Sequence, residues 1–305
     1  MATQLQERVE AVVKPVGVKR VRDGRLWDVG VWTVLGLVTL VTLAPLWYVL
    51  VISVTPTELW ARTNGSLFPT NITFAAYQQL LENGRLFRAM GVSLYVTVVG
   101  TALSLAVTTL MAYPLARKRF KLRRPILLIV LFTMLFNGGL IPTYLIVRDL
   151  NLLDSYWSLM LPNLVSAFNL LVMKAFFQSL PDEIEEAARI DGASEWQILW
   201  RIVLPLSKPI IATIGLFYAV AEWNSFFDAV LYMNDADKQP LQVVLRSILT
   251  SGNLSAYVDV TAADTPPQQS LQMAAVVITT IPVLLVYPFL QRYFTAGVLL
   301  GSVKD

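Results

Sequence analysis

The stretch AMGVSLYVTVVGTALSLAVTTLMAY, from Ala89 to Tyr113, contains no charged residue. As a helix it would be about 37 Å long, which exceeds the roughly 30 Å hydrocarbon core of a membrane. The whole chain is 55% hydrophobic and only 15% charged, whereas soluble domains carry about 25% charged residues. The sequence therefore predicts a membrane protein and excludes a water-soluble single domain.

Five further apolar stretches have the length of a membrane-spanning helix. They are residues 29–53, 126–147, 156–178, 209–233 and 273–296. Each has more than about 20 residues, the length that crosses the hydrocarbon core. Together with 89–113 they predict an all-α, polytopic membrane protein with six transmembrane helices. The first apolar stretch exceeds the roughly 7–15 residue core of a cleavable signal peptide, so we expect it to remain as a helix.

Lys and Arg residues set the predicted orientation, because basic loops remain on the cytoplasmic side. One basic cluster lies in the N-terminal tail, and another follows the second span at residues 117–124. With six spans, both clusters and eighteen of the 24 Lys and Arg residues fall on one side. Both termini are therefore predicted to be cytoplasmic, with tails at 1–28 and 297–305 and a six-helix transmembrane domain at 29–296.

Polar residues inside the predicted spans are candidates for a translocation path. The fifth span contains two carboxylates, and a charge at membrane depth is costly unless water or a partner stabilises it. Aromatic rings stack on the apolar face of a sugar ring, and amides bond its hydroxyls. The candidates are Glu222, Trp223, Asn224, Asp228, Asn137, Tyr144 and Asn169. Helix packing is the alternative interpretation, because amides and small residues are common where membrane helices cross.

The connection between the fourth and fifth predicted spans reads SLPDEIEEAARIDGASEWQILWRIVLPLSK (179–208) and indicates two short helices. Ser179 is a candidate cap for the first helix, and Gly192 can adopt the backbone conformation that ends it. Ser194 and Gln197 have the spacing of a capping box for the second helix. We therefore expect a helical hairpin on the cytoplasmic side.

This hairpin carries more apolar surface than a solvated loop needs. In the first helix one stripe contains Ile184, Ala187, Ala188 and Asp191, and in the second helix one face contains Trp196, Leu199, Trp200 and Val203. The alanines make the first stripe flat, which favours close docking of another protein. A helix lying in the lipid headgroups is the alternative, but such helices favour Lys and Arg on their polar face, and this loop is rich in Asp and Glu.

The same loop carries a recognisable motif. Glu186-Ala187-Ala188, three residues, Gly192, nine residues and Ile202-Val203-Leu204-Pro205 together resemble the EAA signature of permease subunits in binding-protein-dependent ABC importers. The pair Trp223-Asn224 and the ending 297–305 are similar to the MalG-like carbohydrate branch, and residues 136–144 and 240–242 resemble its LplC-like oligosaccharide group. The resemblance implies the MalG-like permease fold and ATP-driven uptake of a sugar or oligosaccharide.

The resemblance also implies site residues and partners, because in that family the first loop helix docks on an ATPase subunit. The implied coupling residues are Glu186, Ala187, Ala188, Gly192, Ile202, Leu204 and Pro205, and the implied C-terminal contacts are Ser302, Val303 and Lys304. The implied partners are a second permease in a heterodimer, two ATPase subunits that bind ATP and Mg, an extracytoplasmic sugar-binding protein, the sugar and membrane lipid. The implied location is a bacterial cytoplasmic membrane.

The composition excludes several kinds of chemistry. The chain contains neither Cys nor His, which rules out thiol and imidazole catalysis and Cys/His metal sites. It also lacks the G-x-x-x-x-G-K-[ST] phosphate loop, so it does not bind ATP in that way. We therefore predict no catalytic residue, no metal site and no cofactor in this chain, and no nucleic-acid partner.

Two other classes of protein stay open as alternatives. An ion-coupled secondary carrier would use Glu222 and Asp228 as coupling carboxylates, but carriers usually place acids in several helices. A membrane glycosyltransferase would need the same two carboxylates to flank one glycosidic bond. Because they are six residues apart, we expect them to point to nearly opposite sides of one rigid helix.

Overall fold

A computed structural model of the chain describes residues 25–56, 68, 71–82, 84–250 and 266–302. All regular structure in these residues is helical, which confirms the all-α prediction. The chain divides into two compact units, Met1–Tyr48 and Val49–Asp305, and the boundary lies within helix α2 (Arg25–Ser53).

Three predicted spans are single helices in the structure. The stretch 29–53 lies in α2, 89–113 lies in α5 (Arg85–Ala116), and 273–296 lies in α16 (Gln268–Ser302). Among the described residues these three helices are long and apolar enough to cross a membrane. The 32 residues of α5 correspond to about 48 Å of helix.

The third predicted span is not a single helix. Residues 126–147 divide between α6 (Arg123–Leu135) and α7 (Leu140–Asp149), whose axes differ by 116°. The side chain of Asn137 accepts a hydrogen bond from the backbone N–H of Gly139 at 2.8 Å. Gly139 has a φ of +86°, which side chains with a Cβ rarely adopt. This local turn therefore explains the break.

The fourth and fifth predicted spans are also interrupted. The fourth contains α8 (Trp157–Met160) and α9 (Ala167–Ser179), and the fifth contains α13 (Lys208–Trp223) and α14 (Phe227–Tyr232). Asn224 ends α13, and its side-chain amide donates back to the carbonyl of Val220 at 2.8 Å. The described residues contain three clear spans, or up to five if each of two strongly bent pairs of helices, 123–135 with 140–149 and 195–206 with 208–223, counts as one.

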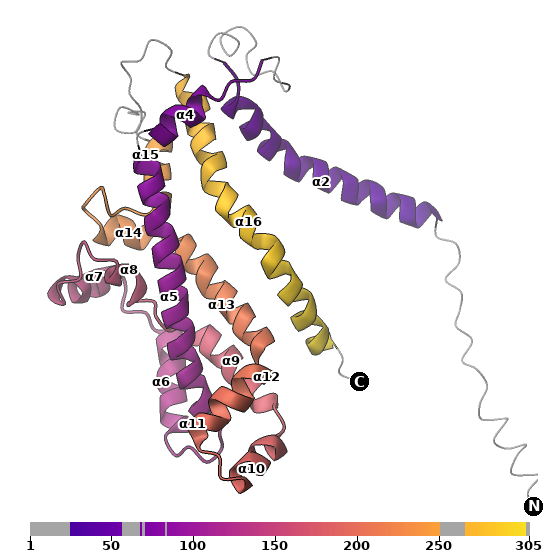
Figure 1. The fold of residues 1–305 in the computed structure, drawn as a ribbon, viewed down its shortest axis with the longest axis vertical. Helices are drawn as coiled ribbons and strands as arrows, with labels where there is room; N and C mark the ends of the chain where they lie inside the picture. The colour runs from indigo at the N-terminus through magenta and orange to yellow at the C-terminus, as the bar shows by residue number, and fades with distance from the viewer. Residues whose placement is uncertain (1–24, 57–67, 69–70, 83, 251–265, 303–305) are drawn as a thin grey trace, which may run out of the picture. The chain divides into compact units, whose positions relative to one another are not determined.

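Helix α5 is the central element of the second unit, where it packs against α9, α13 and α15 (Leu241–Thr250) (Figure 1). Its buried face carries small residues at every fourth position: Gly100, Ser104, Thr108 and Ala112. Small residues at this spacing allow the backbones of two membrane helices to approach closely. The small residues of α5 therefore let α13 pack closely against it.

Apolar clusters hold the two ends of α5. Near its N-terminus, Leu80 of α4 (Ala75–Glu82) and Leu271 of α16 are buried together with Leu86. Near its C-terminus, Phe177 and Ile198 belong to a second cluster, which joins α5 to α9, α13 and the loop helices. Residues 179–208, called the inner loop here because they are predicted to be cytoplasmic, are therefore packed against α5, α9 and α13.

That loop contains α10 (Asp182–Ile190), α11 (Glu195–Ile198), a π-helical turn (Leu199–Val203) and α12 (Leu204–Leu206). The predicted capping box of Ser194 and Gln197 is confirmed, and Gly192 has the expected positive φ of +79°. The predicted cap by Ser179 is wrong. Its hydroxyl donates to the carbonyl of Phe176 at 2.7 Å, and Pro181 precedes α10 without a side-chain cap.

Candidate functional site

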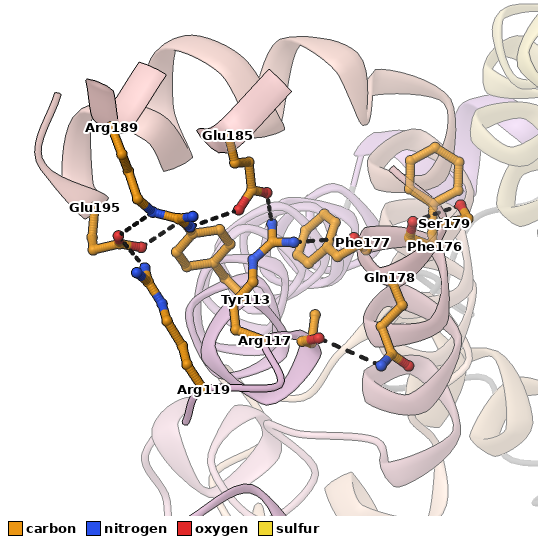
Figure 2. A network of polar contacts seen from close by, with 11 residues as sticks. Tyr113, Arg117, Arg119, Phe176, Phe177, Gln178, Ser179, Glu185, Arg189 and Glu195 are labelled. Carbon is orange, nitrogen blue, oxygen red and sulfur yellow. Dashed lines mark hydrogen bonds and ion pairs between the residues drawn. The ribbon is translucent and has the colours of Figure 1, made fainter. Parts of the chain in front are cut away.

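The inner loop is fixed to the end of α5 by a buried ion pair between Arg117 and Glu185 (Figure 2). Their side chains are 9% and 5% exposed. Arg117 follows the last turn of α5, lies 4.7 Å from the centre of the Tyr113 ring and donates to the carbonyl of Phe177 at 3.5 Å. One guanidinium therefore joins α5, α9 and α10.

A second carboxylate, Glu195, completes this polar network at the start of α11 (Figure 2). It forms an ion pair with Arg119, and it accepts hydrogen bonds from Arg189 at 3.2 Å and from the Tyr113 hydroxyl at 3.0 Å. Arg189 also donates to Glu185 at 3.1 Å. The network thus ties both loop helices to each other and to α5.

The two loop carboxylates have opposite pKa shifts. Burial is the largest influence on Glu185 and raises its pKa, although Arg117 and Arg189 act against it. Burial also acts to raise the pKa of Glu195, but hydrogen bonds from Arg119, Arg189 and Tyr113 together bring it below its ordinary value. Glu195 is therefore stabilised in its charged form by its partners.

The predicted docking stripe of α10 is only partly correct. Ile184, Glu186 and Ala187 are exposed, whereas Ala188 packs against the apolar cluster of its own chain. Ile190 is 87% exposed and had no place in the predicted stripe. The outward face of α10 is therefore an acidic helix surface with apolar residues at 184, 187 and 190, next to the exposed Gly192.

The predicted single face of the second loop helix is wrong. Leu199 and Val203 are buried, but Trp196 and Trp200 are 60% and 56% exposed, with their rings in edge contact at 6.1 Å. The four residues form two neighbouring stripes, and only one of them faces the core. The remaining predicted coupling residues are Ile202 and Leu204, which are half-buried, and Pro205, which is exposed.

A second candidate site is a cavity of about 670 Å³ between the α8–α9 connection and the helices α13 and α14. Asn163, Ser166 and Asn169 line one side. The hydroxyl of Tyr218 accepts a hydrogen bond from the backbone N–H of Ser166 at 3.0 Å and lies 2.6 Å from the hydroxyl of Thr108. These contacts hold the two walls of the cavity to α5.

Glu222 and Asp228 both line this cavity. The prediction that they point to nearly opposite sides is therefore wrong. It assumed one rigid helix, whereas α13 ends at Trp223 and the chain turns before α14 begins. Asp228 accepts a hydrogen bond from the side chain of Asn163 at 2.8 Å. The carboxyl of Glu222 lies against Gly100, where an added Cβ would come within 2.9 Å of its carboxyl carbon.

The other predicted path residues lie at separate places, with the exception of Asn169, which lines the cavity. Trp223 packs against the apolar cluster at the N-terminal end of α5, and the side chain of Asn224 bonds its own helix end. Tyr144 stacks on Tyr232 with ring centres 6.2 Å apart. Asn137 forms the turn between α6 and α7.

Sequence reasoning did not select the aromatic wall of the cavity. Phe168 and Phe217 line it, with ring centres 6.3 Å apart. Phe168 immediately precedes the predicted Asn169, and this adjacency was the one feature of the sequence that could have placed Phe168 at the cavity. Among the described residues no group of three or more acidic side chains is placed to hold a metal ion. The predicted tail contacts Val303 and Lys304 lie outside the described residues, as does the side chain of Ser302.

Comparison with known proteins gives a consistent result. Residues 98–299 match the family of binding-protein-dependent transport system inner membrane components. The chain belongs to this family. The permease is 49% identical to protein LplC of Bacillus subtilis, over 93% of this chain and 96% of LplC. It is 45% identical to the polygalacturonan/rhamnogalacturonan transport system permease protein YtcP of the same organism, over 92% of this chain and 99% of YtcP.

A solved structure supports the fold of the permease. A chain of a bacterial ABC transporter involved in the import of the acidic polysaccharide alginate superposes with a TM-score of 0.84 and 33% sequence identity. The match covers 90% of this permease and 98% of that chain. The resemblance inferred from the EAA signature is thereby confirmed. Members of this family work with a second permease, ATPase subunits and a binding protein.

Proposed function

We propose that this chain is one of two different permease subunits in a bacterial ABC importer for a sugar or oligosaccharide. It spans the cytoplasmic membrane six times with both termini inside. The observation that carries the proposal is the geometry of α10: its inward face is held by the Arg117–Glu185 ion pair, while Ile184, Ala187 and Ile190 are exposed. A helix that is fixed on one side and exposes three apolar residues on the other suits a partner that transmits movement through it.

That partner is an ATPase subunit. Two ATPase subunits bind ATP and Mg outside this chain, and the α10 surface transmits their movement to the spans. ATP binding favours the outward-open state and hydrolysis restores the inward one, which shifts the population between two states. Glu186, Ala187 and Gly192 form the contact, and Ala188, Ile202, Leu204 and Pro205 support it. The C-terminal residues Ser302, Val303 and Lys304 form a secondary contact.

The sugar assignment is supported by two features. The relatives include a permease named for polygalacturonan and rhamnogalacturonan transport, and the cavity of this chain combines aromatic rings with amide and carboxyl groups. An extracytoplasmic binding protein delivers the sugar, and the cavity forms this subunit's part of the path. An ion-coupled carrier is not favoured, because the relatives are permease components of ABC systems.

Substitution on the outward face of α10 tests the coupling role. In the complete transporter reconstituted in liposomes, Ala187→Trp should prevent the ATPase subunits from co-purifying and should abolish ATP-driven uptake. A matched control is Ala236→Trp, since Ala236 is exposed in the loop between α14 and α15, at the opposite end of α5 from α10. The control should retain the ATPase subunits. If Ala187→Trp keeps both co-purification and uptake, the proposed coupling surface is wrong.

A further inference from the structure

The cavity beside α13 is lined by acidic side chains and by no basic ones. Its lining contains the carboxyl groups of Glu222 and Asp228 but no Lys or Arg side chain. Glu185, the other buried acidic residue of the described chain, has a cationic partner in Arg117. The cavity is therefore rich in hydrogen-bond acceptors and provides no cation for an anionic guest.

Some polar groups of the cavity have no partner within the described chain. Glu222 is 8% exposed and Asn169 is 5% exposed, and the side chain of neither forms a hydrogen bond or ion pair there. Buried polar groups are nearly always satisfied in native proteins. These groups are therefore placed to bond something that enters the cavity.

The apolar part of the lining suits one face of a sugar ring. Phe168 and Phe217 stand 6.3 Å apart and tilted, and both are partly exposed. Aromatic rings combine a large apolar surface with defined geometry, and a pyranose ring has an apolar face and a rim of hydroxyls. The two rings can cover the apolar face of the sugar, while Glu222, Asn169 and Asp228 accept hydrogen bonds from the hydroxyls on its rim.

We propose that this cavity is a sugar subsite that accepts a neutral or amino-substituted sugar unit and discriminates against uronic acids. The inference rests on the proposed function and adds the chemical class of its substrate. A uronate carboxylate in this cavity would lie near two acidic groups without a cation, and like charges across an interface are strongly disfavoured. Hydroxyl and ammonium groups would instead donate to these acceptors.

This substrate class differs from those named for two relatives. The permease YtcP is named for polygalacturonan and rhamnogalacturonan, and the superposed solved transporter imports the acidic polysaccharide alginate. Similarity of the whole fold does not determine the chemistry of one cavity. The charge of the groups that line the cavity determines which ligand it accepts, because specificity often depends on unfavourable contacts with the wrong ligand.

The absence of cysteine from the chain allows a direct test. Ala221 lines the cavity, and Ala221→Cys introduces the only thiol of this subunit. The assembled permease pair with its ATPases, without the binding protein, is treated with a water-soluble maleimide, and labelling of this subunit is followed by mass spectrometry. The probes are length-matched trimers of galactose, galactosamine and galacturonic acid. Ala236→Cys in the exposed outer loop is the control thiol.

The galactose or galactosamine trimer should slow labelling at position 221 about tenfold at a concentration of about ten times its Kd, and the galacturonic acid trimer should not. None of the trimers should change labelling at position 236. Equal protection by the galacturonic acid trimer, or no protection by any trimer, would overturn the subsite. Adding Glu222→Gln and Asp228→Asn should give the galacturonic acid trimer measurable protection, and if that variant fails to assemble, the comparison of the three trimers decides alone.

Failure of the subsite can be distinguished from failure of the proposed function. ATP-driven uptake by the complete transporter measures the proposed function, and protection at position 221 measures the subsite. Protection by the galactose trimer without ATP-driven uptake of any sugar would reject the importer and leave the subsite. Uptake with equal protection by all three trimers would reject the subsite and leave the importer.

Discussion

Two carboxylates of the inner loop and two carboxylates of the membrane cavity have different surroundings. In the loop, Glu185 and Glu195 are both paired with arginines. In the cavity, Glu222 has no partner among the described residues and Asp228 has only the amide of Asn163. A charge that is fully paired within its own chain stabilises that chain, whereas one without a partner is available to a ligand. The comparison therefore separates a structural use of acidic residues from a binding use.

Breaking the buried ion pair should give the largest effect. Arg117→Met leaves Glu185 buried without its main partner, and loss of one member of a buried pair costs about 3–5 kcal/mol. We expect a large fall in the thermal unfolding temperature of the purified transporter and loss of the ATPase subunits.

Arg119→Met is the matched control for that change, because Arg119 and its partner Glu195 are each about half exposed. Exposed pairs contribute about 0–1 kcal/mol, so the control should change the unfolding temperature little. Combining Arg117→Met with Glu185→Leu should recover most of the lost stability, since apolar replacements of buried pairs are well tolerated. An equal loss in the two arginine variants would contradict the structural role of the buried pair.

Moving the unpaired carboxyl should affect transport more than assembly. Gly100→Val places a side chain within reach of the Glu222 carboxyl, because even an added Cβ would lie 2.9 Å from its carboxyl carbon. Overpacking of this kind costs about 1–3 kcal/mol. The flexible carboxyl would shift into the cavity, and we expect ATP-driven uptake to fall about tenfold, equivalent to about 1.4 kcal/mol, with the ATPases still bound.

Gly91→Val on the same helix is the control, since an added Cβ at Gly91 meets nothing within 4 Å. It should leave uptake nearly unchanged. If both valine variants transport equally well, Glu222 has no role in the path. If Gly100→Val loses the ATPases as well, the Glu222 carboxyl has a structural role, and it then does not differ in role from the paired carboxylates of the loop.

The sequence predicts the features of this permease that depend on nearby residues. The apolar length of 89–113 is sufficient to predict α5, and the Ser194–Gln197 spacing is sufficient to predict the capping box. The positive φ of Gly192 follows from its place after a short helix. Each of these depends on residues within one helix or one turn, so a pattern in the chain can show it.

Features that depend on distant residues or on one local hydrogen bond could not be predicted in the same way. Arg117 and Glu185 are far apart in sequence, and the basic cluster around Arg117 gave information only about orientation. The convergence of Glu222 and Asp228 depends on the turn at Asn224, which hydropathy does not show. Hydrophobic spacing likewise gave no means of deciding that Ala188 faces the core.

The smallest expected effect concerns pH and compares the two paired loop carboxylates with each other. Hydrogen bonds keep the pKa of Glu195 below its ordinary value of 4.5, so its stabilising contribution is complete above about pH 4.5 and is lost as the pH falls through the lower folded value. The pKa of Glu185 is raised, so its contribution instead increases on acidification. The protection factors of the α11 amides, which correct for the intrinsic slowing of amide exchange in acid, should therefore fall below pH 4.5 in the wild type, and Glu195→Gln should make this fall smaller. Acid sensitivity that is removed by Glu185→Gln but not by Glu195→Gln would reverse the roles of the two carboxylates.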